Sequence, residues 1–157
     1  MELIVDGYNV IHGVPELRAV GKHSLADARN QLERRLARYR ASRRGVGVLL
    51  YWDGDSDVVP GGPERVQGIT VVFARSSADS AIVGRVKASG SPGQITVVTD
   101  DRALARAAKN EGAGVIPVDR LAKWLTEVTE RSPGKLRPDR GVGKEITDEL
   151  KDVWGTD

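Results

Sequence analysis

Several residue types that common enzyme mechanisms need are absent or rare in this chain of 157 residues. There is no cysteine, which excludes disulfides, thiolate metal ligands and cysteine nucleophiles. With only two histidines, His12 and His23, a zinc site built from several histidines is not expected. Aromatic residues make up only 4% of the chain, so the core must be built mainly from Val, Leu, Ile and Ala.

Long apolar runs and nucleotide-binding motifs are missing as well. No stretch reaches the ~18–20 apolar residues of a membrane span. The first apolar run has no basic segment before it and is interrupted by Asp6, so we expect a strand there and not a signal peptide. No G-x-G-x-x-G follows this run, and no strand–turn nucleophile is present. We therefore expect a cytoplasmic protein without membrane contact and without a nucleotide cofactor.

Positive charge is concentrated in one segment, although the net charge of the chain is only +2. Seven arginines and only two acids lie between residues 24 and 44. Such a segment suits the binding of a polyanion through its phosphates. A solvated, arginine-rich helix face has the same composition, and the residues alone leave both interpretations open.

Short β-branched runs alternate with helical patterns along most of the chain. Strands are predicted at 2–6, 46–52, 69–73, 95–98 and 115–118, and helices at 24–42, 77–89, 101–111 and 120–129. This alternation predicts a parallel sheet with helices on both faces. The connection 53–68 holds two prolines and four glycines and is predicted to be a loop.

We place the end of the folded domain at residue 130. A polar stretch begins at Ser132, and the charges from there to the C-terminus nearly cancel. Residues 131–157 are therefore predicted to be a charged tail, with a short amphipathic helix between Glu145 and Trp154.

Aspartates follow the predicted strands or begin the predicted helices. They are Asp6, Asp53, Asp79, Asp100 and Asp101. Ligands of open parallel sheets bind beyond the carboxyl ends of the strands, where the strand order reverses. If the order is 3-2-1-4-5, the chain segments carrying these acids meet at that point. Ligation by oxygen alone favours Mg²⁺ or Mn²⁺ over Zn²⁺.

Each acid also has a structural interpretation. Asp79 could close a capping box with Ser76, and Asp53 could be a turn residue. Either Asp100 or Asp101 could cap the following helix. The residues themselves do not decide which of these two is the metal ligand.

Other side chains near the acids could contact a substrate. Asn9 could satisfy backbone groups of a loop, or it could position a phosphate or a metal-bound water. Tyr8 and Trp52 could stack a nucleobase, although Trp52 is equally suited to the core. The arginines predicted to contact a phosphate backbone are Arg29, Arg34, Arg38, Arg75 and Arg102.

An ordered set of five segments resembles the YacP-like branch of NYN domains, which belongs to the PIN-like ribonucleases. The segments are Val5-Asp6-Gly7-Tyr8-Asn9-Val10-Ile11, Ala28-Arg29, Trp52-Asp53, Ser77-Ala78-Asp79 and Val98-Thr99-Asp100-Asp101. Covering roughly residues 2–130, the resemblance implies a PIN-like three-layer α/β/α fold with strand order 3-2-1-4-5. It also implies a metal-dependent endoribonuclease, in some members acting on ribosome-associated mRNA.

The resemblance also carries over to single positions. Asp6, Asp79 and Asp101 match the family's metal acids, and Asp53 matches a recurrent acid after the second strand. The family usually has Thr-Ser-Asp where this chain has Thr99-Asp100-Asp101. Asp100 therefore replaces a small residue.

The leading hypothesis is an endoribonuclease that uses Mg²⁺ or Mn²⁺ and water to cut single-stranded RNA, leaving a 5′-phosphate and a 3′-hydroxyl. The residues assigned to its site are Asp6, Asp79 and Asp101 as metal ligands, Asp53 or Asp100 in support, and Asn9 for water or phosphate. Two alternatives stay open: an RNA- or ribosome-binding module with an idle site, and a phosphatase or DNA-directed nuclease on a similar sheet.

Overall fold

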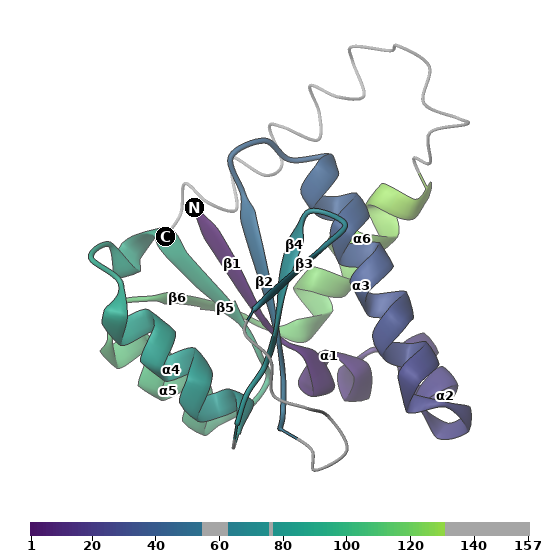
Figure 1. Ribbon diagram of the computed structural model, residues 1–157, viewed down its shortest axis with the longest axis horizontal. Coiled ribbons are helices and arrows are strands. Elements are labelled where there is room, and N and C mark those ends of the chain that lie inside the picture. Colours follow the sequence, from purple (N-terminus) through teal and green to yellow (C-terminus); the bar gives the residue numbers. More distant parts are fainter. Residues whose placement is uncertain (55–62, 76, 131–157) are drawn as a thin grey trace.

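The computed structural model describes residues 1–54, 63–75 and 77–130. The predicted tail of residues 131–157, including its helix, lies outside the described residues, as do residues 55–62 of the long connection. Within the described part, helices cover both faces of a central sheet (Figure 1). The predicted three-layer α/β/α architecture is therefore confirmed.

The sheet of the described residues has six strands in the order β3-β4-β2-β1-β5-β6. They are β1 (Glu2–Asp6), β2 (Gly47–Trp52), β3 (Glu64–Val66), β4 (Ile69–Phe73), β5 (Ile95–Val98) and β6 (Gly114–Ile116). Neighbouring strands are parallel, except that β3 and β4 form an antiparallel hairpin. The five predicted strands thus keep the predicted order, and β3 is an additional edge strand.

The prediction of a loop over residues 53–68 was wrong at its C-terminal end, where β3 lies. Gln67 and Gly68 both have positive φ, 52° and 90°, as a two-residue hairpin turn requires. Glutamine is not among the residues that usually mark such a turn. The three residues of β3 are also too few to show a period-2 pattern.

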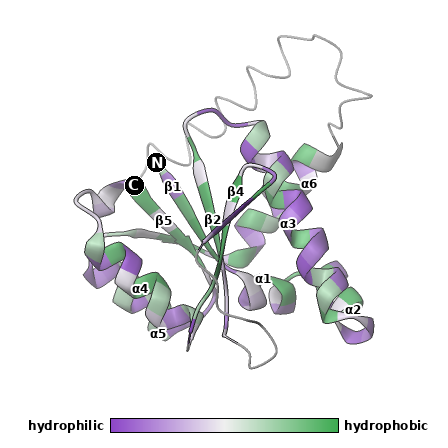
Figure 2. Ribbon diagram, viewed as in Figure 1, coloured by the Kyte–Doolittle hydropathy of each residue, from purple (hydrophilic) through white to green (hydrophobic). Residues whose placement is uncertain are grey.

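The centre of the sheet is buried on both faces. Leu3, Ile4 and Val5 of β1 have no exposed surface, and every residue of β5 is buried. Leu3 and Val5 belong to the core on one face of the sheet, whereas Ile4 belongs to the core on the other. Strands covered on both sides read as continuous apolar runs, and the hydropathy colouring of β1 and β5 shows this (Figure 2).

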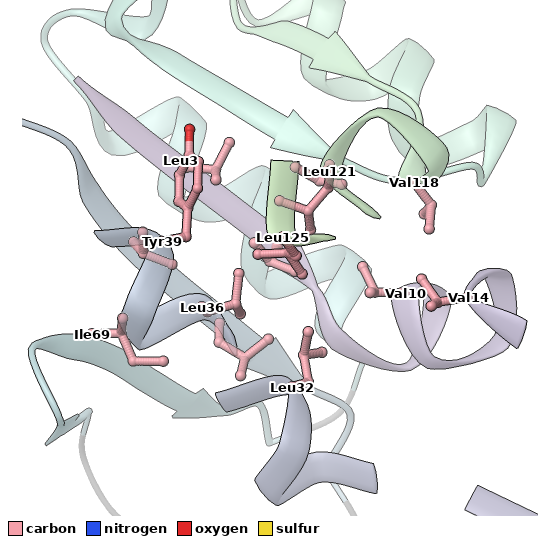
Figure 3. Packing of buried hydrophobic residues seen from close by; sticks show 14 of the residues in the cluster. Leu3, Val10, Val14, Leu32, Leu36, Tyr39, Ile69, Val118, Leu121 and Leu125 are labelled. Carbon is pink, nitrogen blue, oxygen red and sulfur yellow. The ribbon is translucent and has the colours of Figure 1, made fainter. Parts of the chain in front are cut away.

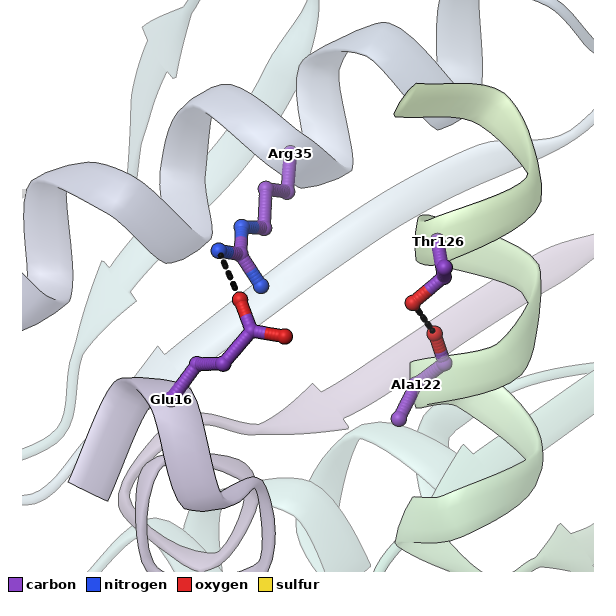
Figure 4. A network of polar contacts seen from close by, with 4 residues as sticks. All are labelled: Glu16, Arg35, Ala122 and Thr126. Atoms are coloured by element: carbon purple, nitrogen blue, oxygen red, sulfur yellow. Dashed lines mark hydrogen bonds and ion pairs between the residues drawn. The ribbon is translucent and has the colours of Figure 1, made fainter. Parts of the chain in front are cut away.

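Three helices cover the first face: α1 (Gly7–Gly13), α3 (Leu25–Ala41) and α6 (Val118–Glu130), and α2 (Pro15–His23) packs against α1 and α3. Leu32 and Leu36 of α3 and Leu121 of α6 lie in one cluster above the sheet (Figure 3). At the surface, Arg35 of α3 pairs with Glu16 of α2 at 3.0 Å (Figure 4). Such an exposed pair contributes at most about 1 kcal/mol, so apolar burial holds these helices in place.

The second face is covered by α4 (Ala78–Ala88) and α5 (Arg102–Asn110). Ile82 and Val86 of α4 and Leu104 of α5 form a smaller core there with Ile4. The four predicted helices are confirmed as α3, α4, α5 and α6, whereas α1 and α2 were not predicted. No helix in the described part of the chain is long and apolar enough to cross a membrane.

Gly7 joins β1 to α1 where the chain passes the ring of Trp52. A Cβ at this position would overlap the indole, and Trp52 is fully buried and cannot move aside. We expect Gly7→Ala to lower the free energy of unfolding in urea by about 1–3 kcal/mol. Gly84→Ala is the matched control, because Gly84 also lies in a helix but has open space around it. It should raise stability by about 0.5–1 kcal/mol, and equal effects of the two substitutions would contradict this steric account.

Candidate functional site

The carboxyl ends of three neighbouring strands bring acids to one edge of the sheet. Asp6 ends β1, Asp53 follows β2, and Asp101 lies shortly beyond β5. Because β1 pairs in parallel with both β2 and β5, these ends lie side by side. Asp79 joins them from the first turn of α4. The structure therefore gathers four of the predicted acids.

Asp6 is the most buried of these acids, with 7% of its surface exposed. The hydroxyl of Thr99 donates a hydrogen bond to Asp6 Oδ2 at 3.2 Å. Burial and then the charge of Asp79 raise the pKa of Asp6 from 3.8 to about 6, against the Thr99 hydrogen bond, which lowers it. Asp53 and Asp101 add smaller repulsions.

Asp53 fixes the start of α4, the helix that carries Asp79. Its Oδ1 accepts a hydrogen bond from the backbone N–H of Ala78 at 2.7 Å. The N-cap of α4 is Ser77, so Asp79 does not stand at the closing position of a capping box. Burial, followed by the charges of Asp101 and Asp53, raises the pKa of Asp79.

Asp100 and Asp101 face different partners. Asp101 Oδ1 accepts hydrogen bonds at 2.9 and 3.2 Å from two backbone N–H groups in the first turn of α5. Its charge also raises the pKa of Asp79. Asp100 Oδ1 instead accepts a hydrogen bond from the backbone N–H of Val118 at 3.0 Å, at the start of α6. Of the two, Asp101 is therefore better placed than Asp100 to be the predicted metal ligand. The geometry does not support the prediction that Asp100 ligates.

Two neutral side chains hold the loop between β5 and α5. Thr99 donates to Asp6, and its Oγ1 accepts a hydrogen bond from the backbone N–H of Asp101 at 3.1 Å. Asn9 Oδ1 accepts one from the backbone N–H of Asp100 at 2.7 Å, as its loop-binding interpretation expects. A catalytic role of Asn9 stays a prediction. Thr99 was not among the predicted site residues, although it lies in the segment Val98-Thr99-Asp100-Asp101 that carries the family resemblance.

The donor set suits a hard divalent cation by its chemistry. In this conformation, no three Asp, Glu, His or Cys side chains of the described residues are arranged to hold a metal ion. The hydrogen bonds of Asp6, Asp53 and Asp101 occupy one oxygen of each side chain. Asp79 and Asp101 also interact through their side chains, which raises the pKa of Asp79, and repulsion among the acids favours a cation. Donors that are all carboxylate oxygens have the chemistry that Mg²⁺ and Mn²⁺ prefer, and metal binding by these acids stays a prediction.

Tyr8 and Trp52 lie on the face of the sheet that α1 and α3 cover. Trp52 is fully buried, and its ring centroid lies 4.9 Å from that of Tyr8. Tyr8 is partly exposed, and its hydroxyl accepts a hydrogen bond from Arg29 Nη1 at 3.0 Å. Trp52 is thus a core residue, and only Tyr8 retains a surface for a ligand.

The predicted RNA-binding arginines divide into two groups. Arg75 follows β4 and Arg102 begins α5, and both are exposed at the edge that carries the acids. Arg29 lies near the start of α3, where it contacts Tyr8. Arg34 and Arg38 are exposed further along α3, where helix geometry puts Arg38 ~13 Å beyond Arg29.

A groove of about 420 Å³ lies between α4 and α5. Val83 and Leu104 are among its lining residues, with Asp79 and Lys87 toward opposite ends of α4. Because Asp79 also belongs to the acid group, the groove adjoins that group on one face of the sheet. Tyr8 lies on the other face.

The family model of the YacP-like NYN domain matches residues 3–153. This chain belongs to that family. The YacP-like NYN domains are PIN-like nucleases, so the acids of this sheet edge lie in a nuclease-like fold. The match extends past residue 130, the predicted end of the folded domain.

Two crystal structures resemble this YacP-like chain. One is of Rae1 (YacP) from Bacillus subtilis, with 25% identity, a TM-score of 0.71, and coverage of 99% of this chain and 92% of that chain. The other is the W164L mutant of the same protein, with 25% identity, a TM-score of 0.69, and coverage of 83% and 77%. Comparison with curated proteins gave no match.

The raised pKa of Asp6 predicts a pH-dependent cost of folding. The folded chain holds this proton more tightly than the unfolded chain, so ionisation destabilises the fold as pH rises from about 4 to about 6. We expect Asp6→Asn to raise the free energy of unfolding at pH 7.5 by about 1–3 kcal/mol without added metal. Urea denaturation at pH 4 and below should show little of this gain. A gain of the same size at both pH values would exclude ionisation as its cause.

Proposed function

We propose that this YacP-like protein is a divalent-metal-dependent endoribonuclease that cuts single-stranded RNA. The observation that carries the proposal is the acid group at the sheet edge. Beyond the effect of burial, Asp79, Asp53 and Asp101 raise the pKa of Asp6, and Asp101 and Asp53 raise the pKa of Asp79. Such repulsion costs stability unless a cation compensates it. This chain also belongs to a PIN-like nuclease family, and phosphodiester cleavage is a reaction that a divalent cation can assist.

In this proposal Asp6, Asp79 and Asp101 hold Mg²⁺ or Mn²⁺, and Asp53 supports them. A bound divalent cation supplies an activated water and stabilises the charge of the phosphodiester and of the leaving 3′ oxygen. Thr99 links Asp6 to the loop of Asp101 through its two hydrogen bonds. The products carry a 5′-phosphate and a 3′-hydroxyl.

The charges around the acids support RNA as the substrate. Arg75 and Arg102 are exposed at the same sheet edge and would contact phosphates on either side of the scissile bond. The arginines of α3 would extend this contact away from the edge. Some members of the family act on ribosome-associated mRNA. The proposal therefore includes RNA that a ribosome presents to this protein.

A second candidate is an RNA-binding module whose site is idle. It is favoured by one observation, namely that no three potential metal-ligating side chains of the described residues are arranged around a common point. Cleavage that depends on added metal separates this candidate from the nuclease.

We expect wild-type protein to cut a 5′-labelled single-stranded RNA with Mg²⁺ or Mn²⁺ and to stop cutting with EDTA. Asp101→Asn should lower the rate by at least about a hundredfold, because it removes a ligand charge. Asp100→Asn is the matched control, since an asparagine oxygen can still accept the Val118 hydrogen bond. It should keep the rate within about threefold.

Metal binding also has a readout that needs no turnover. Mg²⁺ or Mn²⁺ should raise the melting temperature of wild-type protein and of Asp100→Asn, but much less that of Asp101→Asn. Cutting that persists in EDTA, or Asp101→Asn cutting at the wild-type rate, would refute the metal site. Binding of RNA without any cutting would instead favour the idle module or a need for the ribosome.

Salt dependence tests the arginines of the sheet edge. In an inactive Asp6→Asn background, Arg102→Ala should weaken RNA binding and reduce the slope of log affinity against log salt by about 1. Lys109→Ala removes the same charge from the opposite end of α5 and should leave the slope unchanged. Fluorescence anisotropy of a labelled RNA over a range of KCl concentrations measures both. Equal slopes for the two variants would place the RNA elsewhere.

A further inference from the structure

We propose that Tyr8 is a nucleobase-binding site, on which one base of the RNA stacks beside the phosphate that is cut. The inference rests on the proposed function, because it states how the acid edge positions its substrate. Three observations carry it: the ring of Tyr8 is held rigidly, it remains partly exposed, and it is joined to the acids through the backbone.

The ring is held from the protein side by Trp52. The two ring centroids are 4.9 Å apart with the planes tilted by 58°, and Trp52 itself has no exposed surface. Gly7 permits this packing, since any Cβ there would overlap the indole. Tyr8 is therefore supported by an immobile group, which lowers the conformational entropy lost when a ligand binds.

The hydroxyl end of Tyr8 is fixed as well. Arg29 Nη1 donates a hydrogen bond to it at 3.0 Å. Arg29 in turn interacts with Glu33, one turn further along α3, and its positive charge opposes the rise that burial causes in the pKa of Glu33. The hydrogen bond from Arg29 thus fixes the direction of the phenol.

The aromatic pair is attached directly to two of the acids. Asp6 lies two residues before Tyr8, and Asp53 immediately follows Trp52. A base on Tyr8 therefore belongs to a nucleotide next to the phosphate at the acids. Stacking on aromatic rings is a common way for proteins to hold single-stranded RNA, and every base offers a face for it.

Other aromatic residues of the described chain do not offer an equivalent surface. Tyr39, Tyr51, Trp52 and Trp124 are buried. Phe73 is partly exposed at the end of β4, but it packs against the core of the first face. Phe73 serves as the comparison residue for Tyr8, because it is the other partly exposed aromatic of the described part.

A double-mutant cycle, which combines substitution of Tyr8 with removal of single bases from the RNA, tests the proposal. The probe is a 5′-labelled single-stranded oligoribonucleotide with one cut site, together with versions in which each of the nucleotides flanking the cut is made abasic in turn. Cleavage with Mn²⁺ is measured as kcat/KM, and affinity is measured by anisotropy in the Asp6→Asn background. The variants are wild type, Tyr8→Phe, Tyr8→Leu, Tyr8→Ala and Phe73→Ala.

For wild-type protein, one abasic position should lower kcat/KM and affinity by between about fivefold and a hundredfold. For Tyr8→Ala and Tyr8→Leu the same position should have less than about a twofold effect, because the stacking partner is already gone. Tyr8→Phe keeps the ring and should behave as wild type in this comparison, and so should Phe73→Ala.

A structural role of Tyr8 gives a different result. It would slow cleavage of all oligonucleotides by the same factor and leave the abasic effect in place, and this outcome would overturn the proposal. If wild type binds RNA without cutting it, cleavage of free RNA is refuted, but the affinity cycle still decides the role of Tyr8. Failure of wild type to bind the oligonucleotide at all would remove both proposals.

Discussion

The pairing of β1 in parallel with both β2 and β5 is the constraint on which the rest of the structure depends. It places the carboxyl ends of three strands at the same level, so that residues far apart in the sequence become neighbours. It also leaves β1 no exposed face, which makes Asp6 a buried carboxylate at the end of an apolar strand. The acid edge and the two cores on either side of the sheet are thus consequences of one arrangement.

Repulsion among the acids is partly offset by the groups that hold them. The N-termini of α4 and α5 point toward the same edge, and helix N-termini carry partial positive charge. Asp53 accepts a hydrogen bond from a backbone N–H group of α4, and Asp101 accepts one from a backbone N–H group of α5. Each helix is therefore fixed by a carboxylate that also belongs to the acid group, which couples local helix capping to the chemistry of the site.

Much of this arrangement followed from the sequence because strand–helix alternation and acids after strands are long-range patterns with few physical solutions. The helix α1 could not be predicted, since its seven residues are too few for a helical period and its stability comes from burying Val10 and Ile11. Pro15 at the start of α2 was a usable signal. The separate directions of Asp100 and Asp101 depend on contacts with α6 and α5, which adjacency in sequence cannot reveal.

The antiparallel strand β3 changes how the sheet ends. Without it, β4 would present a free row of backbone donors and acceptors along five residues. Instead, the outermost strand has only three residues, and its Glu64 and Arg65 are exposed charges. The opposite border, β6, is equally short. Short border strands are poor templates for strand addition from another chain, and the exposed charges of β3 make its border poorer still. This hairpin therefore protects the sheet against edge-to-edge aggregation.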